Sequence, residues 1–294
     1  MTVSRVPQAP WRQFERQVAN LFCFKSYEPV TDTKFAGRQH DILLRGNDEH
    51  LGSILVECKY FGSRERVGVK AVEDFAARVI RLRNSGDISA GYLVTNTDFS
   101  PEAKGCLFGR VEEKFVFVRT YDFLLRRLIN FEPYLKRFTR QYDESRTSQT
   151  YEPLEALNRN DGSHGYCDQI LAEFVTSQEQ SMVVLLGDYG SGKTTSCLHL
   201  CYTLAKLSLQ QGLTGRIPCY IPLSYFNYCG TAPALISKFL TTDVGVSGTS
   251  YDAFEAMHRA GLLVLVLDGF DEMARRVTQQ VREESFRAIG ALCT

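Results

Sequence analysis

The stretch GDYGSGKT, at residues 187–194, constrains the fold of this chain more than any other part of the sequence. It follows the apolar run SMVVLLG, at 181–187, and precedes the helical pattern KTTSCLHLCYTLAKLSL. The spacing GxxxxGK[ST], between a buried strand and a helix, is typical of a loop that wraps around phosphate groups. Glycines let such a loop turn its backbone N–H groups toward phosphate oxygens, and the following helix adds its positive end. The sequence therefore predicts a phosphate-binding loop in the second half of the chain.

Seven residues of this loop are the predicted nucleotide contacts. They are Gly187, Gly190, Ser191, Gly192, Lys193, Thr194 and Thr195. We expect Lys193 to contact the β- and γ-phosphates of ATP, or of another nucleoside triphosphate, and the Thr194 hydroxyl to ligate Mg²⁺. A glycine turn that matches the spacing by coincidence is the alternative, and the flanking strand and helix patterns argue against it.

A second apolar run, LLVLVLDGFDEM, ends in carboxylates. Asp268 lies at the carboxyl end of the predicted strand, where doubly wound sheets bind ligands, so we expect it to serve the Mg²⁺ directly or through water. Asp271 and Glu272 follow at once and could orient or deprotonate an attacking water. The alternative is a group of acids that stabilises a helix N-terminus, which explains one of the pair better than it explains three carboxylates.

The first half of the chain carries charges at the end of another predicted strand, SILVECKY. Alternate residues of a strand share a face, so Glu57 and Lys59 point one way and Cys58 the other. Asp41 opens the preceding predicted strand, DILLR, and neighbouring strands lie about 4.8 Å apart. Asp41 and Glu57, with the main-chain carbonyl of Cys58 and waters, would make an oxygen-rich Mg²⁺ site. Lys59 would orient the attacking water or offset charge on phosphorus.

Other interpretations of these residues stay open. The Glu57–Lys59 pair alone is also consistent with a salt bridge at a strand end. Glu15, on a predicted amphipathic helix, is either an additional metal or supporting residue or a solvated helix carboxylate. His40, beside Asp41, could be a base, and a solvent-facing imidazole is the simpler expectation.

The order of elements predicts an α/β protein with two domains. Residues 1–140 show the order α-β-β-α-β-α-β-α, in which TDTKFAGRQH forms a loop. Residues 141–165 are polar and predict a linker, and 166–294 show strands and helices that suit part of a doubly wound parallel sheet. Such a sheet needs more strands than this part supplies, so we expect the front part of a longer protein or an unusually short relative.

Charge and composition limit the partners. Residues 1–140 hold 23 Lys and Arg against 17 Asp and Glu, a balance of +6, whereas residues 141–294 hold 11 and 17, a balance of −6. A basic first half suits a polyanion, although a solvated surface would show the same balance. The nine cysteines form no CxxC pair, and the sequence shows neither a signal peptide nor an apolar run of membrane-spanning length. These features predict a cytoplasmic protein with reduced thiols and no membrane partner.

Both halves resemble known families. Asp41 and the Glu57-Cys58-Lys59 triplet, with FERQVANLF, QHDILL and GYLVTNTDFSPEA, resemble the PD-(D/E)xK nucleases of the Mrr-like restriction endonucleases. Many Mrr-like members carry Gln where Glu57 stands, and Gln39-His40 departs from the usual approach to the first acid. The second half, through GDYGSGKTT, RIPCYIPLSYF and LLVLVLDGFDE, resembles the NACHT group of STAND NTPases. The resemblances imply a restriction-endonuclease-like α/β core followed by a partial P-loop NTPase sheet.

The fusion implies an antiviral DNA endonuclease that cuts double-stranded DNA when ATP binding makes NACHT modules form a homo-oligomer. A foreign (phage) trigger would be sensed by a region absent from these 294 residues. One alternative is a signalling or scaffold NTPase whose front domain binds DNA or a partner without cutting. Another is a type IV-like restriction enzyme for modified DNA, which the absence of helicase-type motifs disfavours.

Overall fold

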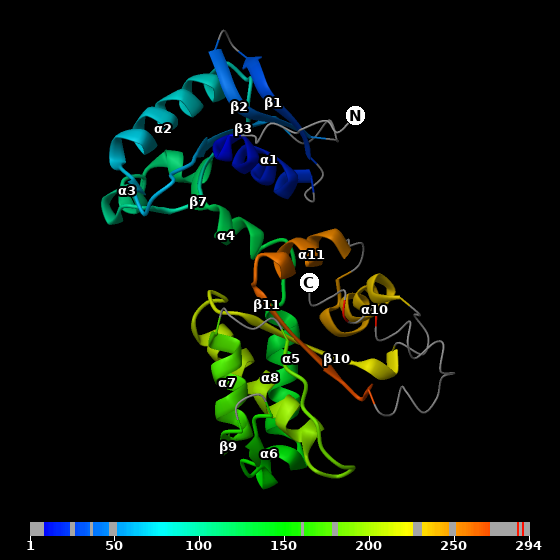
Figure 1. Cartoon of the computed structure of the whole chain (residues 1–294). Helices are drawn as coiled ribbons and strands as arrows, with labels where there is room; N and C mark the ends of the chain where they lie inside the picture. Colours follow the sequence, from blue (N-terminus) through cyan, green and yellow to red (C-terminus); the bar gives the residue numbers. More distant parts are fainter. Residues whose placement is uncertain are drawn as a thin grey trace, which may run out of the picture. The chain divides into compact units, whose positions relative to one another are not determined.

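The computed structural model describes residues 9–23, 27–35, 38–46, 52–159, 162–177, 182–225, 231–246 and 251–270, with single positions 287 and 290. The chain divides into two compact units, residues 1–128 and 129–294 (Figure 1). This division falls before the domain boundary that the sequence predicts at residue 140. In the described part of the chain, no helix combines the length and the apolar character needed to cross a membrane.

The first unit is built on one mixed sheet of five strands. In spatial order these are β1 (Tyr27–Phe35), β2 (Arg38–Gly46), β3 (Ile54–Lys59), β5 (Ala90–Thr95) and β7 (Val116–Thr120). The pairs β1–β2 and β2–β3 are antiparallel, and β3–β5 and β5–β7 are parallel. Leu43 of β2 is opposite Leu55 of β3, and this register brings the residues just before Leu43 beside those just after Leu55.

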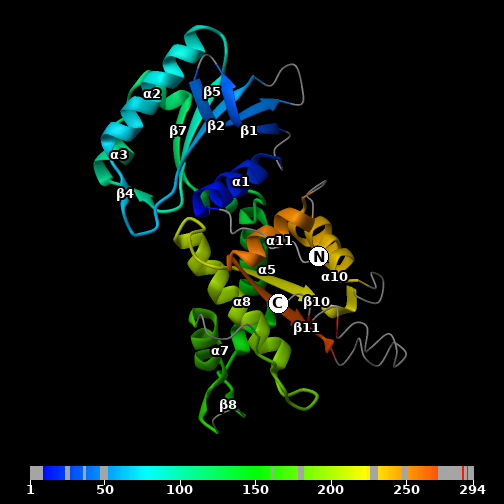
Figure 2. The ribbon, with the colours of Figure 1, turned by 45° about the horizontal axis from the view of Figure 1, so that its top comes forward.

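Helices cover both faces of this sheet (Figure 2). The amphipathic helix α1 (Pro10–Cys23) packs its Phe22 ring edge-on against Tyr92 of β5, with ring centroids 5.3 Å apart. Helix α2 (Val69–Asn84) packs on the opposite face, because its buried side chains share a core with Leu93, the next residue of β5. The sheet therefore separates a face covered by α1 from a face covered by α2.

Gly91 of β5 allows α2 to come very close to the sheet. A Cβ atom at this position would lie 2.3 Å from Cγ2 of Val79 and 2.9 Å from Cζ of Phe75, both on α2. Because real Cβ atoms do not approach other atoms so closely, a side chain here would require α2 or its residues to shift. The spacing between this helix and the sheet thus depends on a missing side chain.

Short elements complete the first unit. They are β4 (Arg66–Val67), β6 (Asp98–Phe99), α3 (Pro101–Gly105), the 3-10 helix η1 (Val111–Lys114) and α4 (Tyr121–Leu125). Ser100 caps α3 by accepting a hydrogen bond from the Ala103 N–H at 3.1 Å, and Pro101 takes the first helical position.

The loop predicted for TDTKFAGRQH is wrong, because its residues 31–35 and 38–40 belong to the antiparallel strands β1 and β2. Strand β1 lies at the edge of the sheet, and none of its described side chains is fully buried. A strand without a buried face has no need for alternating apolar residues, so its sequence looks like a loop.

The second unit begins with the helices α5 (Glu132–Asp143) and α6 (Arg146–Thr150) and the hairpin of β8 (Glu155–Leu157) with β9 (His164–Tyr166). The sequence predicts a linker over residues 141–165, which is most of this segment. Next come α7 (Cys167–Thr176), α8 (Lys193–Gln210), β10 (Ile217–Pro222), the 3-10 turn η2 (Leu223–Tyr225), α10 (Ala232–Phe239), the π-helical turn η3 (Leu240–Val244), α11 (Tyr251–Arg259) and β11 (Leu263–Asp268). Strands β10 and β11 are parallel, with Pro222 opposite Asp268.

The strand predicted for SMVVLLG is not formed. Residues 182–188 have no strand assignment, and the side chains of Met182, Val184 and Leu186 are 52%, 64% and 62% exposed. An apolar run becomes a strand only when a neighbouring strand accepts and donates its backbone hydrogen bonds. Within the described residues, β10 and β11 pair with each other and not with this run.

Candidate active sites

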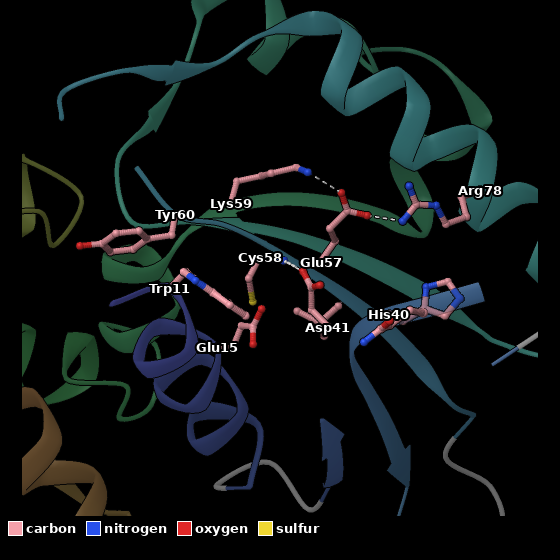
Figure 3. Close-up of a pocket in the computed structure, with 11 residues that line it drawn as sticks. Trp11, Glu15, His40, Asp41, Glu57, Cys58, Lys59, Tyr60 and Arg78 are labelled. Atoms are coloured by element: carbon pink, nitrogen blue, oxygen red, sulfur yellow. Dashed lines mark hydrogen bonds and ion pairs between the residues drawn. The ribbon is translucent and has the colours of Figure 1, made fainter. Parts of the chain in front are cut away.

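A pocket of about 490 Å³ lies at the carboxyl end of β3 and holds the charged residues predicted for the nuclease site (Figure 3). It is lined by Trp11, Glu15, Gln39, His40, Asp41, Val56, Glu57, Cys58, Lys59, Tyr60 and Arg78. Helix α1, strands β2 and β3, and helix α2 all contribute. The structure thus brings Asp41, Glu57 and Lys59 together, as the strand pattern predicts.

The Asp41 carboxylate is held against the backbone of β3. Its Oδ2 accepts a hydrogen bond from the backbone N–H of Cys58 at 2.7 Å. Burial raises the pKa of Asp41, and the nearby Glu57 carboxylate raises it further, whereas the Cys58 N–H, Lys59 and Arg78 lower it. The raised pKa means that the negative charge of Asp41 is not fully compensated by its surroundings.

Glu57 is clamped between two cations. Lys59 Nζ lies 2.8 Å from its Oε1, and Arg78 Nη1 of α2 donates to its Oε2. Figure 3 shows Lys59 and Arg78 approaching this carboxylate from two sides. Both oxygens of Glu57 are therefore engaged by side chains that carry positive charge.

The donor set fits Mg²⁺, which is usually held by one or two carboxylates and several waters. Asp41 and Glu57 offer carboxylate oxygens, and the Cys58 carbonyl is the third predicted ligand. Asp41 is half-buried, and burial raises the pKa of its carboxyl. Among the residues that the structure describes, no group of three or more His, Cys, Asp or Glu side chains is arranged to share a metal ion.

Glu15 lies at the same pocket, on α1. Burial raises its pKa, and the Asp41 and Asp32 carboxylates raise it further, whereas Arg12 lowers it. This placement favours the interpretation of Glu15 as an additional metal or supporting residue over that of a solvated helix carboxylate. Its role at the site remains a prediction.

The expectation that His40 faces solvent is wrong. His40 is only 5% exposed and lines the pocket. It lies on β2, directly opposite Thr33 of the edge strand β1, where the sequence predicts a loop.

The sequence patterns do not single out three further pocket residues, Arg78, Trp11 and Tyr60. Arg78 lies on the helix that covers the Glu57 face, and no local pattern connects it with residues about 20 positions earlier. For Trp11 and Tyr60, the sequence gives only a weak indication of a role at the site, through their positions beside other site and core residues. Trp11 is three residues before the buried Phe14 on α1, and Tyr60 directly follows Lys59.

The phosphate-binding loop has the backbone that its glycines predict. Gly192 is the N-cap of α8 with φ of 88°, a left-handed conformation that favours glycine. A Cβ atom at Gly192 would also lie 2.5 Å from Cδ1 of Leu154, the residue before β8. Lys193 Nζ donates to the carbonyl oxygens of Gly187 and Asp188, each at 2.8 Å.

Other predicted nucleotide residues are placed only in part. Thr194 and Thr195 lie in the first turn of α8, and Gly190 and Ser191 precede it in the loop. Asp268, at the end of β11, accepts a hydrogen bond from the Tyr220 hydroxyl at 2.8 Å. Burial raises the pKa of Tyr220, and the bond to Asp268 raises it further. The predicted pair Asp271 and Glu272 lies outside the described residues.

Comparison with known proteins finds a family model that matches part of each unit. Residues 6–112 match the restriction endonuclease model Mrr_cat, and residues 181–294 match the NACHT domain model. An uncharacterized WD repeat-containing protein, alr3466 of Nostoc sp., is 24% identical over 221 residues. The match covers 69% of this chain and 14% of that protein's length.

Solved structures that match part of this chain are remote in sequence and superpose weakly. A repair endonuclease from Pyrococcus abyssi is 16% identical, over 40% of this chain and 48% of that chain, with a TM-score of 0.27. The DNA modification-dependent restriction endonuclease AspBHI is 18% identical, over 42% of this chain and 37% of that chain, with a TM-score of 0.28. From the two family matches, the chain is an Mrr-type restriction endonuclease domain joined to a NACHT domain with a P-loop NTPase fold.

Proposed function

We propose that this chain is a Mg²⁺-dependent DNA endonuclease whose cleavage is controlled by ATP-dependent self-association of its NACHT domain. The observation that supports this most is the convergence of Asp41, Glu57 and Lys59 in one pocket of the restriction endonuclease domain. A strand-end salt bridge would explain Glu57 and Lys59, but it would not require a buried carboxylate with a raised pKa beside them.

Each residue has a defined task in this proposal. Asp41, Glu57 and the Cys58 carbonyl would hold the Mg²⁺, which when bound polarises a phosphate oxygen and acidifies a bound water. Lys59 Nζ, at the mouth of the pocket, would orient the attacking water or offset negative charge on the phosphate. Arg78 would hold Glu57 in place in the absence of the metal, because it bonds the oxygen that Lys59 does not.

Double-stranded DNA is the proposed substrate. The first 140 residues carry a net charge of +6, which suits contacts to backbone phosphates that do not depend on sequence. One pocket cuts one strand, so a double-strand break requires two copies of the chain. ATP bound at Lys193 and Thr194, with Asp268 near the Mg²⁺, would favour the homo-oligomer that brings two pockets to one duplex. Defence against phage DNA is the role that this combination suggests.

A plasmid assay with the 294-residue chain tests the proposal. Supercoiled plasmid is incubated with protein, Mg²⁺ and ATP, and nicked and linear products are followed over time. We expect Lys59→Ala to reduce cleavage by about 100- to 1,000-fold, the usual cost of removing one group that stabilises a transition state. Lys104→Ala is the matched control, since Lys104 lies in the same unit, is 55% exposed and pairs with Asp98 outside the pocket.

Two results would contradict the proposal. One is cleavage by Lys59→Ala that equals cleavage by the unchanged protein, which would mean that the activity comes from another site or a contaminant. The other is the absence of cleavage at any protein concentration and in any combination of Mg²⁺ and ATP. Linear product that rises more steeply than protein concentration, and only with ATP, would support control by self-association.

A further inference from the structure

Trp11 is a large aromatic residue at the mouth of the nuclease pocket. Helix α1 buries Phe14, Val18, Leu21 and Phe22 against the sheet, and Trp11 continues the same stripe one turn earlier. Whereas Phe14 and Val18 are 3% and 0% exposed, Trp11 is 46% exposed. The stripe thus extends beyond the packed core, and its first member faces the pocket instead of a core side chain.

Tyr60 offers a second partly exposed ring at the same pocket. It is 40% exposed and directly follows Lys59. The buried Phe14 supports it from behind, with ring centroids 5.9 Å apart, and Tyr121 packs edge-on against Phe14 at 5.8 Å. A ring that is fixed from one side and open on the other is a suitable platform for stacking.

Positive charges accompany these rings. The guanidinium of Arg12 lies 5.0 Å from the centroid of the Trp11 ring, and Lys59 and Arg78 line the pocket. Figure 3 shows Trp11 and Tyr60 on the side of the pocket away from Arg78. Aromatic rings between cations, beside a phosphate-cleaving site, form the combination that binds unpaired nucleic acid bases through stacking.

We propose that Trp11 and Tyr60 bind an unpaired nucleobase next to the phosphodiester that is cut, so that within double-stranded DNA the preferred cleavage position is a locally opened segment. This inference rests on the proposed endonuclease function and specifies its substrate class. Lys59, Tyr60 and Trp11 line the same pocket, so a nucleotide whose phosphate reaches Lys59 would have its base within the pocket that these two rings line. A volume of about 490 Å³ falls within the range of pockets that hold small ligands.

Energetics explain why an opened segment is preferred. A paired base must leave its stack before it can enter the pocket, and this step costs least where the base is already unpaired. The pocket rings replace the lost stacking in either case. Single-stranded DNA therefore binds with the full stacking free energy from Trp11 and Tyr60. For an intact duplex, part of that free energy is offset by the cost of opening the base pair.

Intrinsic fluorescence provides the first test, because Trp11 is the single tryptophan of the chain. The 294-residue chain is titrated in EDTA, so that no cleavage occurs, with a 12-nucleotide single strand or with the blunt duplex of the same sequence. We expect the single strand to quench the emission at lower concentrations than the duplex. Equal quenching curves for the two, or no quenching by the single strand, would overturn the inference.

Variants provide the second test, read by the anisotropy of a labelled oligonucleotide. Trp11→Ala should raise the Kd for the single strand about 5- to 150-fold, equivalent to about 1–3 kcal/mol per stacked base, and change the duplex Kd much less. Tyr60→Ala should act in the same direction, and Trp11→Phe should restore most of the affinity. Phe108→Ala is the control, since Phe108 is an aromatic residue of the same unit, 83% exposed and outside the pocket.

A loss of affinity in Phe108→Ala equal to that in Trp11→Ala would overturn the inference, because it would show nonspecific binding. Circular dichroism melting separates loss of binding from loss of folding in each variant. The plasmid assay keeps the two proposals distinct. Cleavage that depends on Lys59 without any preference for unpaired bases removes only the stacking inference. Base-dependent quenching without cleavage removes the endonuclease function and, with it, the assignment of this base to a cut phosphodiester.

Discussion

The two candidate sites differ in how much of each is held in place by packing. At the nuclease pocket, Asp41 is bonded to the backbone of β3, and Glu57 is bonded to both Lys59 and Arg78. At the phosphate-binding loop, residues 186–191 are exposed, and Lys193 donates to carbonyl oxygens of its own loop. The first site is assembled by the sheet of its own unit, whereas the second has the loop and helix without a paired strand before them.

This difference has a physical origin. In the first unit, β2, β3 and β5 are hydrogen-bonded neighbours, so Asp41 within β2 and Glu57 and Lys59 at the end of β3 are fixed by the same register that fixes the core. In the second unit, the apolar run before the loop stays exposed in the structure. We therefore expect substitutions at the nuclease pocket to change the stability of the first unit as well as its activity. We expect bound ligand to stabilise mainly the second unit.

The largest expected effect separates the two sites by their activities. Glu57→Gln should reduce plasmid cleavage by at least about 100-fold, because it removes a charge on which the metal and Lys59 depend. The affinity for ATP, measured by isothermal titration, should stay within about twofold. Lys193→Ala, in contrast, should weaken ATP binding. The Kd for ATP should rise by about 10- to 150-fold, since one charge-assisted bond contributes about 1.5–3 kcal/mol. A loss of ATP binding in Glu57→Gln would show that the sites are coupled.

The next effect concerns the ligand dependence of the second unit. ATP at 100 times its Kd should stabilise the unit that binds it by about 2.7 kcal/mol. Amide hydrogen exchange followed by mass spectrometry should show slower exchange in peptides from 187–210, with little change in peptides from 54–95. Lys193→Ala is the matched control, because it should show the same exchange with and without ATP. If ATP slowed amide exchange equally in both regions, the expected difference between the two units would be contradicted.

A smaller effect is expected from Arg78→Ala, which removes one of the two cations on Glu57. Because a partly buried carboxylate loses a charge-assisted bond, the free energy of unfolding in EDTA should fall by about 1.5–3 kcal/mol. Mg²⁺ should recover part of this loss, since a bound metal would occupy the carboxylate that Arg78 leaves. The exposed Arg110→Ala serves as the control in urea denaturation. A loss that Mg²⁺ does not reduce would show that Arg78 supports the fold alone.

The smallest effect concerns Asp41 and pH. The pKa of Asp41 is raised in the folded protein, so its contribution to stability is greatest below its unfolded pKa and is lost as the pH rises through the folded pKa. Asp41→Asn should therefore stabilise the metal-free protein at pH 7.5 by about 0.5–2 kcal/mol, as substitutions of strained site residues often do. The gain should shrink toward pH 4.5. Asp74→Asn, at an exposed position of α2, should show no such trend in urea denaturation.

Local sequence patterns predicted the features that depend only on residues within one helix, strand or turn. The alternation around Glu57 and Lys59 places both on one strand face, and the 2.8 Å salt bridge between them agrees with that prediction. The Ser100 cap and the glycine at Gly192 likewise depend on neighbours in sequence. Helix α2 likewise buries one stripe of apolar residues, as the helical period requires.

What the sequence could not show depends on partners far along the chain. None of the side chains of the edge strand β1 whose burial the structure describes is buried, so its pairing with β2 is what identifies it as a strand. The run at 181–187 is as apolar as β11, yet it has no paired neighbour among the described residues. Arg78 reaches Glu57 across 21 residues of sequence, and only the packing of α2 on the sheet brings them together.

The narrow space above Gly91 has a consequence for the charge of the nuclease pocket. Val79, the neighbour of Arg78 on α2, occupies the volume where a Cβ atom of residue 91 would lie. A single methyl group there would lift the helix outward and, with it, the guanidinium that neutralises Glu57. Glu57 and Gly91 lie on adjacent strands, but residue 91 does not line the pocket. The charge balance around Glu57 thus depends in part on the absence of a Cβ atom at Gly91, on the face of the sheet that α2 covers.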